Sequence, residues 1–471
     1  MSIRLFNTYS RELEDFRPLD TSGRAVKMYT CGPTVYSYAH IGNFRAYLFE
    51  DLLQRHLETR CYTVERVMNI TDVDDKTIRG CQAAGVPLAQ FTQQFKDAFF
   101  ADLETLRIKR ADTFPAATDP QQIAAMIEMI RILIERDLAY QAEDKSVYFR
   151  IKNFPEYGHL AHFNLDELQS TGRVKNDEYE KESIGDFALW KAWDEADGAV
   201  RWESPWGPGR PGWHIECSAM ATQILGDQLD IHCGGVDNIF PHHEAEIAQT
   251  EGCTGRQFVR YWLHCAHLMV DGQKMSKSLG NFYTLRDVLA KGYSGREVRY
   301  ALMRVHYRAP LNFTFEGMQE ARQALARIDD WLDRLRSKAA EGENLDGAGA
   351  VDANDKFADA LDDDLNISGA LGVLFETIRE TNRGLDDDSL DPGASARWLG
   401  WWAKVDAVLG VAGETAAGIP AEVAALVEAR AQARLAKEWR ESDELRDQLA
   451  ALGWEVRDGK DGQKITKRAG G

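Results

Sequence analysis

The sequence predicts an α/β protein in which a parallel sheet carries an insertion and is followed by a helical region and a small C-terminal α+β module. Residues 26–32 have the pattern of a buried strand, residues 41–57 repeat apolar side chains at helical spacing, and residues 63–70 alternate like a second strand. Strand, turn, helix and strand in this order form a βαβ unit, whose two strands are parallel. From Phe315 onward the apolar period becomes helical.

Length and composition narrow the class of protein. At 471 residues the chain exceeds what one hydrophobic core organises, so we expect about two to four domains. The net charge of −19 argues against a general nucleic-acid binder, whose affinity comes from neutralising phosphates. No apolar run approaches the roughly 18 residues of a membrane span, and we expect a cytoplasmic protein. Seven cysteines without a C-x-x-C pair favour free, metal-ligating or catalytic thiols over disulfides.

The middle of the chain is less regular. Residues 145–215 are rich in aromatic and turn residues, and we interpret them as an insertion between two halves of the sheet. Strand-like residues return at 228–235, and a helical stretch follows near 242–249.

The C-terminal part is mainly helical. One apolar stripe at helical spacing consists of Met318, Ala321, Leu325, Ile328, Leu332 and Leu335. Flexible breaks are expected at 339–350 and 410–420. The tail then holds one or two helices and a short hairpin turning at Asp-Gly within residues 454–465.

The turn after the first strand carries the sequence HIGN, His40 to Asn43. It opens the predicted helix at the carboxyl end of a strand, where unpaired backbone N–H groups and the helix dipole can bind an anion. His40 and Asn43 add side-chain donors, and Gly42 permits close approach to the backbone. Taken alone, the turn is equally well explained by a capping histidine. No G-x-G-x-x-G follows the first strand of this βαβ unit, so the turn is not an ordinary dinucleotide site.

A second motif, KMSKS, spans Lys274 to Ser278, 234 residues after His40. Two lysines and two hydroxyls on a short loop next to a glycine suit a mobile clamp for a polyphosphate. A solvated charged loop is the simpler explanation when the segment is considered singly.

Together these motifs are the signature of class I aminoacyl-tRNA synthetases. The stretches CGPTVYSYAHIGN, NITDVDDK, GRPGWHIECSAM, DIHCGGVDNIFPHHEAEIAQ and KMSKSLGN closely resemble cysteinyl-tRNA synthetases, and the resemblance covers nearly the whole chain. It implies a Rossmann-like parallel-sheet catalytic domain with an insertion, a helical bundle and an anticodon-binding module. The implied boundaries are 1–115 and 206–313 for the two catalytic halves, 116–205 for the insertion, 314–415 for the bundle and 416–471 for the module.

The resemblance also implies one zinc ion held by Cys31, Cys217, His242 and Glu246. His242 and Glu246 are four residues apart, so one helix face presents both, and all four side chains are ordinary zinc ligands. We expect the same helix to turn His243 and Glu244 away. Four cysteines, Cys61, Cys81, Cys253 and Cys265, are expected to be structural. A thiolate is a far better zinc ligand than a hydroxyl, so the zinc would distinguish cysteine from serine.

Other residues take roles by resemblance. The catalytic residues would be His40, Asn43, Lys274 and Lys277. The ATP-binding residues would be His40, Gly42, Asn43, Gly234, Gly235, Asp237 and Lys277, with Mg²⁺ accompanying ATP. The cysteine-binding residues would be Gly32, Thr71 and Trp213, although Trp213 equally suits an anchor for the Pro-Gly turn. The anticodon-binding residues would be Arg434, Trp439, Asp443, Arg446 and Asp458, although a salt-bridged helix surface explains them equally well.

Several residues depart from the family pattern or stay without a role. The family motif is often HIGH, whereas the fourth residue here is Asn43. Asparagine can donate a hydrogen bond but cannot carry a positive charge, so only a charge-based role at this position is in doubt. Cys233 stands where glycine is frequent, and nothing explains it. Asp72, Asp74 and Asp75 could equally be turn residues and are left unassigned.

The predicted activity is a cysteine–tRNA ligase that forms cysteinyl-adenylate from ATP and transfers the cysteinyl group to tRNA(Cys). The expected partners are tRNA(Cys), ATP and L-cysteine, with no membrane and a monomeric chain. Two alternatives are a related ligase that transfers cysteine to an amino sugar in mycothiol synthesis and a non-catalytic paralogue that binds RNA or zinc. An anticodon module would have no purpose in the first, and intact HIGN and KMSKS motifs argue against the second.

Overall fold

The computed structural model describes residues 2–163, 185–276, 279–342, 355–413, 421–459 and 462–467. The chain forms two compact units. The first comprises residues 1–282, 302–313 and 351–379, and the second comprises residues 283–301, 314–350 and 380–471.

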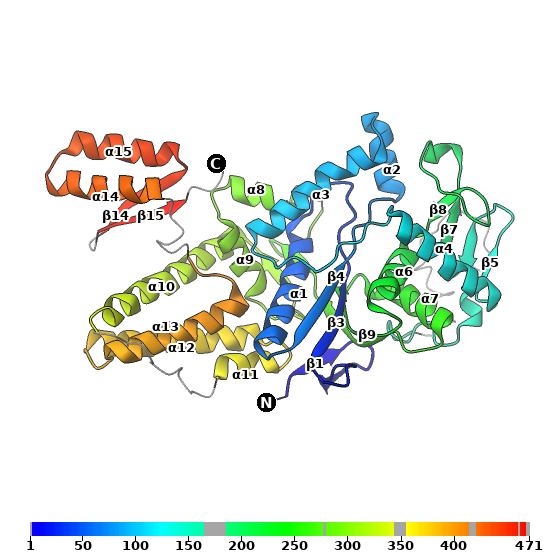
Figure 1. Ribbon diagram of the computed structural model, residues 1–471, viewed down its shortest axis with the longest axis horizontal. Helices are drawn as coiled ribbons and strands as arrows, with labels where there is room; N and C mark the ends of the chain where they lie inside the picture. The colour runs from blue at the N-terminus through cyan, green and yellow to red at the C-terminus, as the bar shows by residue number, and fades with distance from the viewer. Residues whose placement is uncertain are drawn as a thin grey trace. The chain divides into compact units, whose positions relative to one another are not determined.

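A parallel four-stranded sheet lies at the centre of the first unit (Figure 1). Its strand order is β10-β9-β3-β4, and the strands are β3 (Ala25–Thr30), β4 (Thr63–Met68), β9 (Leu229–Gly235) and β10 (Val259–Cys265). Helix α1 (Ile41–Thr59) connects β3 to β4, so the predicted βαβ unit is confirmed. Because β3 pairs with β4 on one side and β9 on the other, the chain order reverses between β3 and β9. Open α/β sheets bind ligands at such a switch point.

Helices cover both faces of this sheet. Val26 and Met28 of β3 pack in one apolar cluster with Leu53 of α1. Tyr29 points to the other face, into a cluster with Met220 of α6 (Trp213–Leu225) and Ile247 of α7 (Glu244–Thr254). Strands buried on both faces read as nearly continuous apolar runs, which is the pattern that identified β3 in the sequence.

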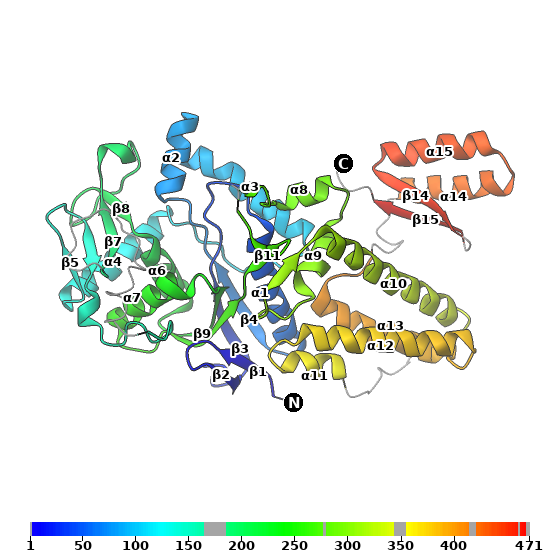
Figure 2. The same cartoon turned by 180° about the vertical axis from the view of Figure 1, so that it is seen from behind.

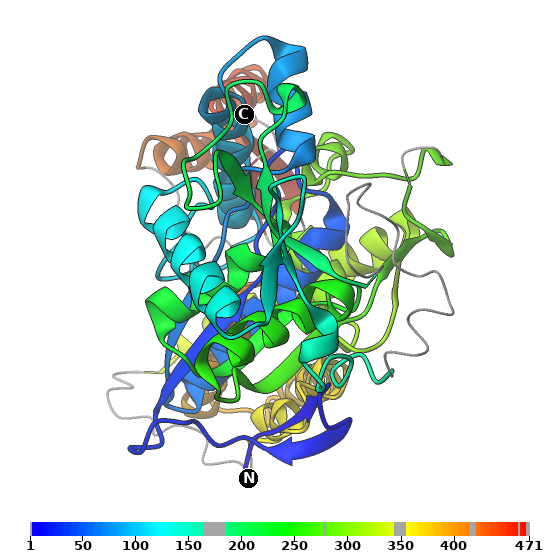
Figure 3. The same cartoon turned by 90° about the vertical axis from the view of Figure 1, so that its right-hand side faces the viewer.

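The insertion has its own regular structure (Figure 3). An antiparallel sheet of order β5-β6-β7-β8 is formed by β5 (Ala139–Gln141), β6 (Val147–Phe149), β7 (Phe187–Ala192) and β8 (Gly209–Pro211). Before this sheet come α2 (Asp75–Ala84), α3 (Leu88–Thr105) and α4 (Pro120–Glu135). The residues of this region, which showed no regular spacing in the sequence, therefore form short strands joined by long connections.

Smaller elements complete the first unit. They are the hairpin of β1 (Arg4–Asn7) and β2 (Glu12–Asp15), the sheet of β11 (Leu268–Val270), β12 (Gln273–Lys274) and β13 (Leu311–Phe313), and α11 (Lys356–Asp362). Buried Asp362 at the end of α11 accepts hydrogen bonds from Arg60 at the end of α1 and lies 2.9 Å from Nε2 of buried His56. This polar contact ties α11 to α1.

The second unit is mainly helical. It contains α8 (Leu285–Ala290), α10 (Phe315–Ala339) and α13 (Pro392–Leu409), while α9 (Gly295–Met303) and α12 (Ile367–Asp386) each cross the boundary between the units. The predicted stripe on α10 is confirmed, because its residues from Met318 to Leu335 are buried. Trp331 of α10 packs edge-on against Trp402 of α13 and donates a hydrogen bond to Thr381 of α12. In the described parts of the chain, none of the helices combines the length and apolar character needed to cross a bilayer.

The chain ends in a small α+β module (Figure 2). It consists of α14 (Ala421–Leu435), α15 (Trp439–Ala451), β14 (Trp454–Gly459) and β15 (Gly462–Lys467). Its apolar core contains Val423, Leu449, Trp454 and Val456. The predicted hairpin is confirmed, since β14 and β15 are antiparallel and pair as far as Gly459 and Gly462. The two residues between them lie outside the described residues.

Gly212 joins β8 to α6, and its lack of a side chain is required by packing. A Cβ added there would lie 2.0 Å from the carbonyl oxygen of Ala188. We expect Gly212→Ala to lower the free energy of unfolding by about 1–3 kcal/mol, because the start of α6 must move away from β7. Urea denaturation would measure this change.

The matched control is Gly372→Ala, on an exposed position of α12 where an added Cβ meets nothing within 4 Å. It should be neutral or stabilise by roughly 0.5–1 kcal/mol, as alanine does in a helix. Equal stability of the Gly212→Ala variant and the wild type would contradict the packing argument.

Candidate active site

A cavity of about 490 Å³ opens at the carboxyl ends of the central strands. It lies at the switch point and brings together side chains from segments far apart in the sequence. Those predicted from the sequence that line it are Cys31, Gly32, His40, Gly42, Asn43, Thr71, Trp213, Cys217, Gly234, Gly235, Asp237, His242 and Lys274. The site residues proposed for the first unit thus lie around one cavity, apart from Glu246, which is described below, and Lys277, which lies outside the described residues.

His40 caps α1 and belongs to the cavity lining as well. The backbone N–H of Asn43 donates to His40 Nδ1 at 3.2 Å, and Asn43 Oδ1 accepts from the His40 backbone N–H at 3.1 Å. Because Nδ1 accepts a hydrogen bond, the ring carries its proton on Nε2. The capping explanation and the anion-binding explanation are therefore compatible. The neutral Asn43 side chain completes the cap, a task that needs no positive charge.

Met275 of the KMSKS segment and Phe282, four residues after the segment, approach the HIGN turn. A Cβ on Gly42 would lie 3.2 Å from Met275 Cε, and the rings of His40 and Phe282 have centroids 5.2 Å apart. Asn281 accepts a hydrogen bond from the Ser276 N–H and donates one to the Lys274 carbonyl. These contacts place Lys274 at the cavity.

The four proposed metal ligands lie together at one side of the cavity. One donor atom from each of Cys31, Cys217, His242 and Glu246 falls within 4.8 Å of all the others. His242 Nε2 and Glu246 Oε1 lie 3.2 Å apart, yet Glu246 Oε1 makes no hydrogen bond among the described residues. Two donor atoms that face each other without sharing a proton are arranged as two ligands of one cation would be. Two thiols, an imidazole and a carboxylate also match the donor preference of zinc.

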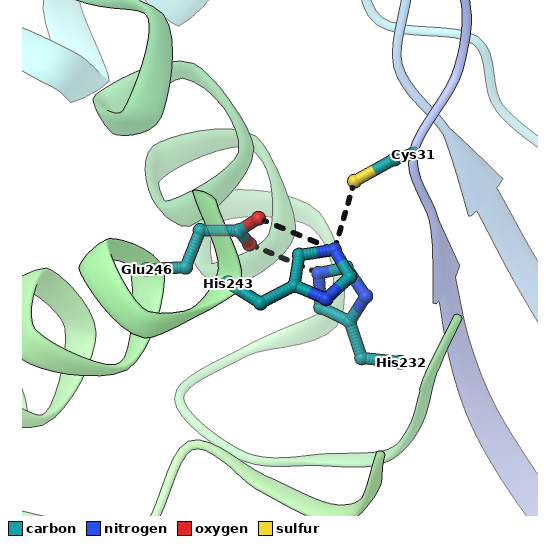
Figure 4. A group of neighbouring side chains, drawn as sticks. All are labelled: Cys31, His232, His243 and Glu246. Atoms are coloured by element: carbon teal, nitrogen blue, oxygen red, sulfur yellow. Dashed lines mark hydrogen bonds and ion pairs between the residues drawn. The ribbon is translucent and has the colours of Figure 1, made fainter. Parts of the chain in front are cut away.

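His243 corrects one expectation. Its Nε2 lies 3.3 Å from Cys31 Sγ, and Cys31, His232, His243 and Glu246 form a second group of donors within 4.8 Å (Figure 4). The expectation failed because residues 239–243 form a π-helical turn and α7 begins only at Glu244. Glu244 does turn away, as expected, and accepts the backbone N–H groups of Gly158 and Ala161.

Burial favours the neutral forms of the His242 imidazole and the Cys217 thiol. Burial, followed by the proximity of His214 and His232, holds the pKa of His242 well below its ordinary value. The hydrogen bond with Cys31 and burial raise the pKa of the Cys217 thiol well above its ordinary value. A neutral imidazole is ready to bind a metal, whereas the thiols would have to release protons on binding one.

A buried network supports the proposed cysteine pocket. The Gly32 N–H donates to Asn69 Oδ1 at 2.8 Å, Asn69 Nδ2 donates to Thr71 Oγ1 at 3.2 Å, and Thr71 Oγ1 donates to Glu216 Oε2 at 2.7 Å. Asn69 and Glu216 were missed in the sequence, although both lie inside the quoted motifs. Trp213 is 45% exposed and stacks on His242 with ring centroids 4.2 Å apart, so it is not a buried anchor.

The glycines at the end of β9 are also required by packing. A Cβ on Gly235 would lie 2.4 Å from Asp237 Oδ1, and one on Gly234 would lie 2.7 Å from His243 Cε1. Both glycines therefore leave space for neighbouring side chains of the site.

Each of the three unassigned aspartates makes contacts within the fold. Asp74 caps α2 through Thr77. Asp72 accepts hydrogen bonds from Lys96 and Thr118, and Asp75 pairs with Lys191 and Arg210.

Two pairs of the proposed anticodon residues are in contact. The Arg434 guanidinium lies 5.7 Å from the ring centroid of Trp439, which is 57% exposed, and Arg446 pairs with Asp443 at 3.1 Å. Asp458 lies on β14, and its side chain is outside the described part of the structure.

Comparison with known proteins defines the class. Residues 18–323 match the family of tRNA synthetases class I (C) catalytic domains, residues 356–412 match the DALR domain, and residues 416–465 match the cysteinyl-tRNA ligase anticodon binding domain. Among solved structures, methionyl-tRNA synthetase of Mycobacterium tuberculosis shares the fold with a TM-score of 0.60 at 17% identity, over 82% of this chain and 88% of that one.

Full-length relatives narrow the class to one family. The cysteine–tRNA ligase of Chlamydia muridarum is 51% identical, over 99% of this chain and 100% of the relative. That of Protochlamydia amoebophila is 48% identical, over 99% of this chain and 98% of the relative. The chain therefore belongs to the cysteine–tRNA ligase family of class I synthetases.

Glu50 is a buried acidic residue of the cavity that was not predicted. Glu50 of α1 lines the cavity and is fully buried. Burial raises its pKa to about 8, against the opposing effect of Arg66.

Glu50 should make stability depend on pH. Between pH 4.5, the ordinary value, and about 8, the folded protein retains a proton that the unfolded chain has lost. Stability attributable to Glu50 should therefore fall as pH rises through this window, by at most about 1.4 kcal/mol per pH unit. We expect Glu50→Gln to flatten the decline, measured by urea denaturation at several pH values. Glu65→Gln, at an exposed position of β4, is the control for lost charge. Identical slopes for both variants would contradict the assignment.

Proposed function

We propose that this chain activates L-cysteine with ATP and transfers the cysteinyl group to tRNA(Cys). The observation that carries the proposal is the single cavity, where the HIGN turn, the start of the KMSKS segment and a cluster of thiol and imidazole donors meet. Membership of the cysteine–tRNA ligase family supports the same activity.

In the first step the cysteine carboxylate attacks the α-phosphate of ATP, and pyrophosphate leaves. The groups that would stabilise the developing charge are the His40 Nε2–H, the N-terminus of α1, Lys274 and Lys277. Asn43 would hold His40 in place through the cap. Asp237 would bind the ribose hydroxyls, and Mg²⁺ would accompany the phosphates. Catalysis of this kind depends mainly on positioning and on charge stabilisation.

Cysteine would be held beside the donor cluster. Cys31, Cys217, His242 and Glu246 would bind one zinc ion, which binds a thiolate far better than a hydroxyl and so would select cysteine over serine. Thr71, fixed by Glu216 and Asn69, and Gly32 would shape the pocket, with Trp213 covering His242. Selection at binding would make a separate editing site unnecessary.

In the second step the terminal ribose hydroxyl of tRNA takes the cysteinyl group. Arg434, Trp439, Asp443, Arg446 and Asp458 would read the anticodon, whose unpaired bases are recognised by stacking and by hydrogen bonds to their edges. The match of residues 416–465 to an anticodon binding domain favours a tRNA acceptor over an amino sugar. The HIGN cap and the placement of Lys274 favour an enzyme over a non-catalytic paralogue. The domain boundaries given above stay a prediction.

An acceptor assay tests the proposal. With labelled cysteine and ATP, the protein should charge tRNA(Cys) and leave an amino-sugar acceptor unlabelled. Trp439→Ala should lower kcat/KM for tRNA by about 5- to 150-fold, the range of one lost base stack, while cysteine-dependent pyrophosphate exchange is unchanged.

Leu452→Ala is the matched control, because Leu452 is also exposed in the C-terminal module. Labelling of the amino sugar instead of tRNA would reject the proposed acceptor. Normal charging by Trp439→Ala would reject only the anticodon role.

The zinc content of variants can distinguish the two groups of donors. Cys217→Ser and His242→Ala should each lower the zinc content of the purified protein, because each removes a proposed ligand. His243→Ala should retain zinc, since His243 belongs only to the second group. Metal analysis with a thermal melt for each variant provides the readout, independently of activity.

The opposite result for the two histidine variants would assign the zinc site to the second group of donors. Retention of zinc by His242→Ala together with its loss from His243→Ala would make Cys31, His232, His243 and Glu246 the site.

A further inference from the structure

The rim of the cavity carries side chains that neither ATP nor cysteine uses in the proposal above. Tyr36 and Tyr38 come from the loop between β3 and α1, and Lys76 comes from the first turn of α2. All three line the cavity that holds the HIGN turn. They are candidates for contacts with the acceptor of the second step.

Tyr38 is an exposed but supported aromatic side chain. Its exposed fraction is 43%. Its ring meets Phe95 of α3 edge-on with centroids 5.4 Å apart, and Phe95 in turn meets Phe91 at 5.3 Å. These contacts hold the Tyr38 ring at the cavity, and exposed, fixed aromatic rings are the surfaces on which unpaired bases stack.

Lys76 places a positive charge at the N-terminal end of a helix. It is the second residue of α2, where the helix dipole favours acidic side chains and disfavours a lysine. Its ammonium lies 4.8 Å from the ring centroid of Tyr36, a contact that keeps it at the rim.

Lys76 also differs from the cations near it. Lys96 pairs with Asp72, and Lys191 and Arg210 both pair with Asp75. Among the described residues, Lys76 makes no ion pair with a carboxylate. Lys76, which has no carboxylate partner among the described residues, therefore lines the same cavity as the exposed Tyr38 ring.

We propose that Tyr38 and Lys76 dock the unpaired 3′-terminal nucleotides of the RNA acceptor, with a base stacked on the Tyr38 ring and a phosphodiester at the Lys76 ammonium. Tyr36 is a positioning residue that holds Lys76. The inference rests on the proposed function, because only a reaction whose acceptor is the end of an RNA chain brings unpaired nucleotides to this cavity. The competing ligand for Lys76 is the triphosphate of ATP, and the experiment separates the two.

The test compares the two half-reactions for variants of Tyr38. Tyr38→Ala should lower the single-turnover rate of transfer to tRNA, or its apparent affinity, by about 5- to 150-fold, the range of one lost base stack. Cysteine-dependent pyrophosphate exchange should stay at the wild-type rate. Tyr38→Phe keeps the ring and should behave as the wild type in both assays.

A truncated tRNA tests the contact itself. Removing the 3′-terminal nucleotides should weaken tRNA binding to the wild type, and it should weaken binding to Tyr38→Ala much less, because the stacking partner is already gone. Equal losses for both proteins would overturn the contact between Tyr38 and the 3′ end.

Lys76 is tested by salt. Lys76→Ala should reduce the slope of log affinity for tRNA against log salt concentration by about 0.7, the value for one phosphate contact on a single strand, and Lys76→Arg should restore it. Lys291→Ala is the matched control, since Lys291 lies the same 4.8 Å over an aromatic ring, that of Phe315, without lining the cavity.

The outcomes are distinguishable. Loss of pyrophosphate exchange in Lys76→Ala would assign the ammonium to ATP and overturn the inference. Normal charging by both Tyr38→Ala and Lys76→Ala would also overturn it and leave the proposed function standing. Failure of the wild type to charge any tRNA would overturn the proposed function and this inference together.

Discussion

The positions of the site residues depend on how β3 ends. Its last residue, Thr30, pairs with Met68 of β4 and with Cys233 of β9, so the chain leaves the sheet at the switch point. There Gly32 approaches the backbone of Asn69 so closely that an added Cβ would lie 1.7 Å from the carbonyl oxygen. This contact fixes the path of the chain and, with it, the position of Cys31. The remaining residues gather around this point because parallel strands present their carboxyl ends at one edge of a sheet.

Burial of the donors around Cys31 has an energetic consequence for the whole site. Without a cation, neutral thiols and imidazoles are the less costly state, because a charged group in this interior would lose its hydration. A bound cation reverses the preference, since it stabilises thiolates and competes for the same lone pairs that protons occupy. Metal binding at this position would therefore release protons and weaken as pH falls. Hydrogen bonds among Gly32, Asn69, Thr71 and Glu216 hold the neighbouring pocket in shape.

Features with a local signal were predictable from the sequence. The β3–α1–β4 unit follows from apolar periodicity, the stripe on α10 from helical spacing, and the hairpin of β14 and β15 from Asp-Gly. The sheet of the insertion was not predictable, because β5, β6 and β8 have three residues each, too few to show an alternation. His243 was misjudged because its position depends on a π-helical turn that residue spacing does not reveal. The place of Glu50 in the cavity was not predictable, because it depends on which side of α1 is buried.

The acidic charge of the chain is compatible with an RNA substrate if recognition uses few phosphates. A net charge of −19 weakens sequence-independent attraction to any polyanion, so duplex RNA gains little from this surface. Two places nevertheless combine an exposed aromatic ring with a nearby cation. Trp439 has Arg434 beside it, and Tyr38 lines the same cavity as Lys76. Stacking needs a base that is not already paired, so such places favour loops and chain ends over helices.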